Sequence, residues 1–254
     1  GTNALKRTGY LAGSDEERLA DLCGMFQDRD IDGILCLRGG YGSMRLLGKI
    51  DYRLIRRNPK ILVGYSDITA LQLAIWKRAG LVTFSGPMLA TEFGKEPDDL
   101  TLGHFLKAVS DPYPLGTIPA RPGHRAVTIN PGQARGRLLG GYLSLVAATL
   151  GTPYELDTRG AILFLEEVGE QPYRIDRLLS QLRLAGKLTA AAGVIFGECV
   201  DCEAEDSFSL LELIEQFFSD LKIPCYYGLC AGHGPLKATL PLGVSAEMDA
   251  CRCQ

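Results

Sequence analysis

Ser66 is the residue of this chain whose type and setting best fit covalent catalysis. It follows an apolar run at 60–64 and precedes a helical pattern, so its side chain should project from a tight strand-to-helix turn. The free N–H groups and positive dipole end of that helix suit a developing oxyanion. This arrangement predicts a nucleophile elbow, although Ile68 stands where the usual Gly-x-Ser-x-Gly pattern has its last glycine. The alternative is that Ser66 only caps the helix.

A glycine-rich stretch, Gly39-Gly40-Tyr41-Gly42, closes the preceding apolar run. Such a strand end can bring backbone N–H groups close to a ligand. It could cradle the phosphate of a nucleotide, or it could form the second half of an oxyanion hole beside Ser66. The nucleotide interpretation is weak, because Arg45 replaces the third glycine of the dinucleotide fingerprint and no Gly-Lys-Ser/Thr string occurs.

A serine nucleophile needs a general base, and the chain has only three histidines. His233 lies just past an apolar run, between Gly232 and Gly234, where catalytic groups of α/β proteins collect. We expect His104 and His124 to be ordinary surface residues. His233 is therefore the predicted base.

Two adjacent carboxylates, Glu166 and Glu167, end another apolar run, and strand alternation sends them to opposite faces. A carboxylate that closes an apolar strand is costly without a partner, so one of them could orient the base. The alternative is that both are solvated at the end of the strand. The order Ser…Glu…His is that of the α/β-hydrolases, although the spacing differs.

The elements that must position these residues alternate along the chain, which predicts an α/β fold with a parallel sheet. The expected strands lie at 31–37, 60–64, 81–84, 161–168, 194–196 and 225–229, and the expected helices begin at 15 or lie at 44–47, 68–79, 141–150, 173–185 and 208–221.

The segment 91–135 breaks this alternation, because it is rich in Pro and Gly and has one short helical stretch at 102–109. We expect an N-terminal α/β domain at 1–90, a linker at 91–135 and a second domain at 136–254. The first residues, from Gly1, look internal to a fold, and 251–254 look like a strand cut short, so we expect pieces to be missing at both ends.

The amino-acid composition limits the classes of partner that the chain is expected to bind. Hydrophobic residues make up 46%, charged residues 22% and the formal net charge is -3, so nothing favours a nucleic-acid or membrane-surface partner. No apolar segment is long enough to span a membrane, and no signal peptide is visible. The eight cysteines are expected to be mostly reduced thiols of a cytosolic protein. A zinc site from Cys199, Cys202, Cys251 and Cys253 is possible, but its spacing is poor.

Five stretches together closely resemble the serine LD-carboxypeptidases, also called muramoyl-tetrapeptide carboxypeptidases. In order, they are Leu37-Arg38-Gly39-Gly40-Tyr41-Gly42, Val63-Gly64-Tyr65-Ser66-Asp67-Ile68-Thr69-Ala70-Leu71, Leu150-Gly151-Thr152-Pro153-Tyr154-Glu155, Leu163-Phe164-Leu165-Glu166-Glu167-Val168 and Gly232-His233-Gly234. The resemblance covers nearly the whole chain, and five ordered motifs are far more specific than any one of them.

The resemblance implies a role for each candidate. Ser66 would be the nucleophile, His233 the general base and Glu166 the acid that orients it, with the backbone N–H groups of Gly40 and Asp67 as the oxyanion hole. It also implies a Rossmann-like N-terminal domain, a C-terminal domain with a β-barrel-like core, a site between them and often a homodimer. The family's first strand and helix would precede the first residue of this chain. No metal and no cofactor is implied.

The function expected from this resemblance is a cytoplasmic serine peptidase that releases the terminal D-Ala of a murein tetrapeptide by cutting an L,D-peptide bond. The related branch that cleaves the peptide antibiotic microcin C is an alternative; the Gly-His-Gly turn and the stretch 173–177 look more like the murein branch. A non-catalytic ligand-binding module remains a second alternative, and a nucleotide-dependent enzyme a third.

Overall fold

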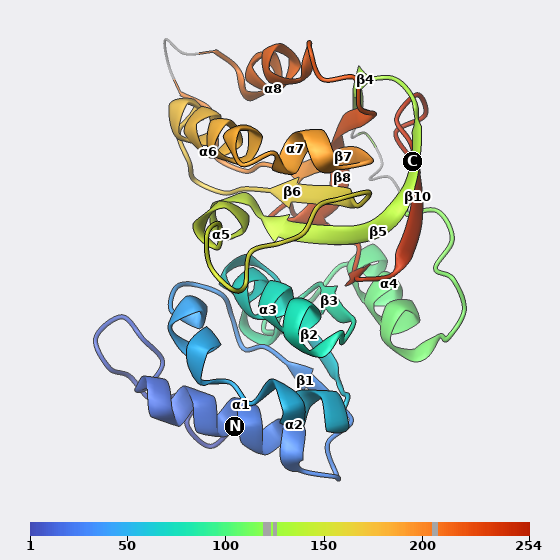
Figure 1. Ribbon diagram of the computed structural model, residues 1–254. Helices are drawn as coiled ribbons and strands as arrows, with labels where there is room; N and C mark the ends of the chain where they lie inside the picture. Colours follow the sequence, from blue (N-terminus) through green and yellow to red (C-terminus); the bar gives the residue numbers. More distant parts are fainter. Residues whose placement is uncertain (119–122, 124–125, 205–207) are drawn as a thin grey trace.

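The computed structural model describes residues 1–118, 123, 126–204 and 208–254, which form two sheets flanked by helices (Figure 1). The first sheet has the strand order β1-β2-β3-β9, and its first three strands are parallel. These strands are β1 Gly33–Leu35, β2 Ile61–Gly64, β3 Thr83–Ser85 and β9 Leu240–Leu242. The α/β prediction is confirmed for this part of the chain.

Four helices pack on the first sheet: α1 Asp15–Gln27, the 3-10 helix η1 Ser43–Lys49, α2 Tyr52–Arg57 and α3 Thr69–Ala79. The start of α1 is fixed by a capping box, in which Ser14 Oγ accepts from the Glu17 N–H at 3.2 Å and the Glu17 carboxylate accepts from the Ser14 N–H at 2.8 Å. Leu22 and Phe26 of α1 are buried against the sheet.

The second sheet has the order β10-β5-β6-β7-β8-β4 and curls into a half-barrel, in keeping with the expected barrel-like core. Its four central strands are parallel: β5 Gln133–Tyr142, β6 Ile162–Glu166, β7 Gly193–Glu198 and β8 Cys225–Gly232. Every residue of β6 and β7 is buried, as expected for strands covered on both faces. Antiparallel strands β4 Val127–Asn130 and β10 Ser245–Asp249 form its two edges.

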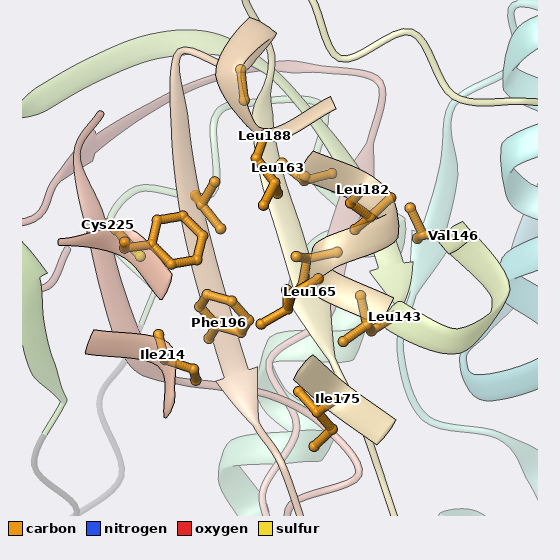
Figure 2. Close-up of a cluster of buried hydrophobic side chains, with 14 of the residues drawn as sticks. Leu143, Val146, Leu163, Leu165, Ile175, Leu182, Leu188, Phe196, Ile214 and Cys225 are labelled. Carbon is orange, nitrogen blue, oxygen red and sulfur yellow. The ribbon is translucent and has the colours of Figure 1, made fainter. Parts of the chain in front are cut away.

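Helices α5 Leu143–Ala148, α6 Pro172–Leu184, α7 Lys187–Ala190 and α8 Leu210–Phe218 belong to the second unit. Figure 2 shows their apolar side chains meeting those of β6 and β7, including Leu165 and Phe196, in one buried cluster. This core fixes the strand ends that carry the candidate residues. Among the described helices, none is both long and apolar enough to cross a bilayer.

The segment 91–135 carries more structure than a linker. It holds α4 Asp99–Ser110, strand β4 and the first residues of β5, and a short π-helical turn, η3 Leu89–Phe93, leads into it. Short strands at sheet edges have little apolar alternation, so the sequence pattern did not indicate β4. The domain limits themselves stay a prediction.

The C-terminal part of the chain also differs from expectation. Strand β9 leaves the second unit and pairs antiparallel with β3 of the first sheet, with Thr83 opposite Leu242. Residues 251–254 form a turn closed by the Asp249 N–H on the Gln254 carbonyl, so the strand predicted there is wrong. The two units are therefore joined by a strand as well as by the connecting segment.

The two sheets meet where β5 passes α3 (Figure 1). Gly141 allows this approach, because a Cβ there would lie 2.7 Å from Thr69 Oγ1 in α3. Gly140 faces the neighbouring strand β6 instead, where a Cβ would lie 1.9 Å from the Phe164 carbonyl oxygen. The Tyr142 N–H then donates to Thr69 Oγ1 at 3.1 Å. This bond ties the end of β5 to the first turn of α3.

We expect the substitution Gly140→Ala to lower the free energy of unfolding by at least about 2 kcal/mol, because the new methyl group would overlap backbone at a positive φ of 127°. Urea denaturation measures the change. Gly103→Ala in α4, where a Cβ meets nothing within 4 Å, should be neutral or stabilising by up to about 1 kcal/mol. Equal unfolding midpoints for the two variants would contradict the packing argument.

Candidate active site

Ser66 lies on a sharp turn between β2 and α3. The backbone passes from extended Tyr65 to a φ of 64° at Ser66, and a short 3-10 turn, η2 Ser66–Ile68, then leads into α3. A positive φ is strained for a residue with a Cβ, and such strain concentrates at functional sites. Neither η2 nor α3 receives a side-chain cap bond, so the N-cap alternative for Ser66 is wrong. The geometry is that of a nucleophile elbow.

The glycine loop after β1 lies against this elbow. A Cβ on Gly39 would lie 2.7 Å from Ser66 Cβ and 2.9 Å from Ser66 Oγ, so only glycine lets the two segments touch. Gly40 and Gly42 follow with φ values of 118° and 125°. The glycine loop 39–42, which was expected to bind either a phosphate or an oxyanion, thus lies next to the serine hydroxyl.

Gly39→Ala should lower kcat about 100-fold, because the added methyl group displaces the Ser66 hydroxyl by a fraction of an ångström or more. Initial rates on a peptide substrate measure this loss. Gly48→Ala in η1 is the matched control, since a Cβ there meets nothing within 4 Å. Full activity of the Gly39 variant would show that the loop does not constrain the serine.

Two backbone N–H groups, those of Gly40 and Asp67, are the predicted oxyanion donors. Within the described ranges, neither N–H makes a hydrogen bond to the protein. The buried Asp67 carboxylate accepts from the Ser43 N–H at 2.8 Å, which ties the elbow to the start of η1 just after the glycine loop. The role of the two N–H groups as oxyanion donors stays a prediction.

The structure pairs His233 with Glu166. Nδ1 of His233 lies 2.6 Å from Oε2 of Glu166, whose side chain is 2% exposed. The carboxylate reaches the ring across β7, where Gly197 leaves room: a Cβ there would lie 3.1 Å from Glu166 Cβ. Because β6, β7 and β8 are parallel, their carboxyl ends bring both residues to one edge of the sheet.

The imidazole of His233 lies between two tyrosine rings. Its centroid is 4.9 Å from that of Tyr65, the residue before Ser66, and 5.4 Å from that of Tyr142. The His233 ring therefore lies beside the residue that precedes Ser66. No hydrogen bond joins the Ser66 hydroxyl to the ring in the part of the chain that the structure describes, and such bonds often tighten only when substrate binds.

Glu167 points to the opposite face, as strand alternation predicts, and it is not solvated. Its carboxylate accepts from the Ser144 N–H at 3.0 Å and the Ser144 hydroxyl at 2.7 Å. Burial raises the pKa of Glu167, although the bonds from Ser144 and the Val168 N–H oppose this shift. Glu167 thus supports the start of α5 rather than the base.

The other two histidines do not join this site. His104 is partly buried instead of lying on the surface, and its Nδ1 accepts from the Thr239 N–H at 3.0 Å. Burial lowers the pKa of His104, which keeps the ring neutral and able to accept that bond. His124 lies outside the described residues.

The sequence analysis did not single out Glu92 and Lys237, which lie next to the site. Lys237 is buried, with its ammonium 3.1 Å from Glu92 Oε1, and the Tyr65 hydroxyl donates to the same oxygen at 3.0 Å. Burial alone would raise the pKa of Glu92, but the bonds from Met88 and Thr91 and the Lys237 ammonium bring it below its ordinary value. The one signal for Lys237 in the sequence is a lone charge in the otherwise uncharged stretch 235–242.

No group of three or more His, Cys, Asp or Glu is placed to hold a metal within the described ranges. Two of the cysteines considered for zinc donate hydrogen bonds to different backbone carbonyls. Cys202 Sγ donates to the Val200 carbonyl at 3.3 Å, and Cys253 Sγ donates to the Ala250 carbonyl at 3.8 Å. Proton transfer and nucleophilic attack are the chemistry that Ser66, His233 and Glu166 can perform.

Comparison with known proteins gives matches over both units. The model of the LD-carboxypeptidase N-terminal domain matches residues 1–86, and that of the LD-carboxypeptidase C-terminal domain matches 135–248. A protein named probable murein peptide carboxypeptidase in Bacillus subtilis is 44% identical over 245 residues, which are 95% of this chain and 76% of that protein.

Two solved structures show how widely this architecture is shared. A muramoyltetrapeptide carboxypeptidase from Oxalobacter formigenes superposes with a TM-score of 0.84 at 32% identity, over 96% of this chain and 84% of that one. The microcin C7 self-immunity protein MccF has been solved in complex with glutamyl sulfamoyl guanosine. That structure superposes with a TM-score of 0.87 at 30% identity, over 97% of this chain and 81% of that one. The ranges matched by the two family models, 1–86 and 135–248, contain Ser66, Glu166 and His233.

Proposed function

Because the chain belongs to the LD-carboxypeptidase family, we propose that it is a serine carboxypeptidase in which Ser66, His233 and Glu166 form the catalytic triad. The observation that carries this assignment is the 2.6 Å contact between His233 Nδ1 and buried Glu166, at a sheet edge that faces the strained elbow of Ser66. Proton-bearing Nδ1 leaves Nε2 free to accept the serine proton.

The reaction follows from these positions. Ser66 Oγ attacks the carbonyl carbon of the peptide bond while His233 Nε2 takes its proton, and Glu166 stabilises the imidazolium that forms. The N–H groups of Gly40 and Asp67 bind the oxyanion. His233 then gives the proton to the departing amine, which leaves an acyl-enzyme. Water, deprotonated by the same histidine, hydrolyses the ester and restores Ser66.

The substrate we propose is a murein tetrapeptide, from which the enzyme releases the terminal D-Ala by cutting an L,D-peptide bond. Support comes from relatives named for murein peptides, including the 44% identical Bacillus subtilis protein. The likeness to MccF keeps a microcin-type peptide as the second candidate. A binding module without catalysis is less well supported, because it gives no reason for a strained serine beside a His–Glu pair.

We also propose that the protein works in the cytoplasm, as murein recycling requires, and that it forms a homodimer. Cys36, Cys199 and Cys225, none of which is exposed, are free thiols in the structure, which suits a reducing compartment. The dimer is proposed from the family resemblance alone, and sedimentation of the purified protein tests it.

Mass spectrometry of a purified murein tetrapeptide after incubation tests the activity. We expect the loss of one alanine, and an otherwise identical peptide that ends in L-Ala should stay intact. Binding of the tetrapeptide without any mass change would favour the ligand-binding module. Cleavage of a microcin-type aminoacyl nucleotide with no cleavage of the tetrapeptide would move the chain to the other branch. A nucleotide-dependent enzyme would instead show a thermal shift with ATP or NAD, which we do not expect.

A further inference from the structure

Lys237 is the one lysine or arginine that is buried among the described residues, at 5% exposure. An ammonium removed from water is strongly unfavourable unless charges and hydrogen bonds replace its hydration. A buried lysine behind the candidate triad therefore needs an explanation in terms of what it holds.

Three groups replace the water around the Lys237 ammonium. Nζ donates to the Gly234 carbonyl at 2.7 Å, pairs with Glu92 Oε1 at 3.1 Å and lies 5.1 Å from the centre of the Tyr65 ring. The Tyr65 hydroxyl donates to the same Glu92 oxygen at 3.0 Å. We call Tyr65, Glu92, Gly234 and Lys237 the Lys237 cluster.

The members of the Lys237 cluster flank the two residues that must exchange a proton. Tyr65 directly precedes Ser66, and Gly234 directly follows His233. Ser66 belongs to the first sheet's unit and His233 to the end of β8 in the second sheet, so the cluster connects the two units at the point of reaction. The Tyr65 ring also packs edge-on against the imidazole, with centroids 4.9 Å apart.

The cluster is held rigidly on its outer side. Glu92 Oε2 accepts from the Met88 N–H at 2.8 Å and the Thr91 hydroxyl at 2.6 Å, so both carboxylate oxygens are engaged. The Lys237 N–H donates to Thr101 Oγ1 of α4 at 2.9 Å, which fixes the lysine backbone. The ammonium therefore acts from a fixed point on both the elbow and the histidine turn.

We propose that Lys237 and Glu92 are positioning residues that set the distance and angle between the Ser66 hydroxyl and the His233 imidazole. This inference rests on the proposed function, because it assumes that Ser66 and His233 exchange a proton. Neither residue needs to touch the substrate. Loss of the pair would let the histidine turn and the elbow move apart while Glu166 still holds the ring.

A purely structural role makes a different prediction. A buried ion pair that only stabilises the fold would affect unfolding and leave the chemical step unchanged. Lys187 offers a matched control, because its ammonium is also partly buried, is paired with Glu155 and donates to the Leu156 carbonyl at 2.9 Å. It lies in the second unit, outside the candidate site.

The test compares Lys237→Met with Lys187→Met by two rates. One is the rate at which a fluorophosphonate labels Ser66, whose Oγ displaces fluoride from phosphorus as its proton passes to His233. The other is kcat on the tetrapeptide. We expect Lys237→Met to lower both about 100-fold with KM changed less than about threefold, and Lys187→Met to lower neither. Equal labelling rates for the two variants would overturn the proposal.

Glu92→Gln provides a second route if Lys237→Met does not fold. The amide keeps the shape of the carboxylate, but its NH₂ group would face groups that themselves donate hydrogen bonds to Glu92. The Lys237 ammonium would also lose its charge partner. Labelling should again slow. Where Lys237→Met does fold, the double variant should be no slower than either single variant, because the two residues act as a unit. Labelling at the wild-type rate would overturn the proposal.

The two proposals fail in different ways. If the wild-type protein labels but leaves the tetrapeptide intact, the proposed substrate is wrong and the labelling comparison still decides the role of Lys237. If the wild-type protein does not label at all, Ser66 and His233 do not form a proton-transfer pair, and both proposals fall.

Discussion

Ser66→Ala should abolish peptidase activity, lowering kcat by about 10⁶-fold, while leaving the protein as stable as the wild type or slightly more so. The loss of rate follows from removing the attacking oxygen, for which no nearby group can substitute. The unchanged stability follows from the geometry, because the Ser66 side chain makes no capping bond and alanine, which also has a Cβ, meets the same strain at the φ of 64°. Tetrapeptide turnover and urea denaturation on the same preparation measure both effects.

Ser66→Gly sharpens this result. Glycine adopts a positive φ without a Cβ penalty, so the glycine variant should be more stable than the alanine variant by about 1 kcal/mol and equally inactive. Ser144→Ala is the control, since its hydroxyl donates to Glu167 at 2.7 Å away from the candidate triad. It should lose about 1 kcal/mol of stability and keep its kcat. Activity retained by Ser66→Ala would rule out the mechanism.

The sequence was most informative where local pattern and buried position coincide. The apolar run that becomes β6 ends in two carboxylates, and alternation alone separates Glu166 from Glu167. The structure gives each a different partner, His233 for the first and Ser144 for the second. The elbow at Ser66 was visible for the same reason, since a buried strand, a glycine and a helix follow one another within a few residues.

Features that depend on distant segments could not be predicted in this way. Strand β9 has only three residues, and its pairing with β3 is decided by where the chain returns after β8. Lys237 is placed by Glu92, far away along the chain, and no local periodicity encodes that pair. The expected helix near 44–47 is a 3-10 helix, Ser43–Lys49, entered from Gly42 at a φ of 125° with no side-chain cap.

His104 shows the same limit for a single side chain. Its sequence setting, on an amphipathic helix in a Pro/Gly-rich region, gave no reason to expect a buried partner. The ring nevertheless accepts the Thr239 N–H directly before β9, so α4 and the returning strand fix each other. The place of His233 after an apolar run predicted it as the base, and the carboxylate 2.6 Å from its Nδ1 is consistent with that prediction.

Glu166→Gln carries the other large effect, and we expect it to lower kcat about 10⁴-fold with little change in KM. The amide fills the same space, but it can donate to Nδ1 and so favours the tautomer whose Nε2 already bears a proton and cannot accept one from Ser66. It also removes the negative charge that stabilises the imidazolium. Steady-state rates on the tetrapeptide measure the loss.

Glu167→Gln is the matched control for this substitution, because the adjacent carboxylate is equally buried and is also hydrogen-bonded, to partners away from His233. Since burial raises the pKa of Glu167, removing its charge should cost less stability at high pH than the broken bonds alone would suggest. Its kcat should stay within about threefold of the wild type, since Glu167 faces α5 and not the base. If the two variants were equally impaired, the orienting role would belong to the paired carboxylates as a unit and not to Glu166.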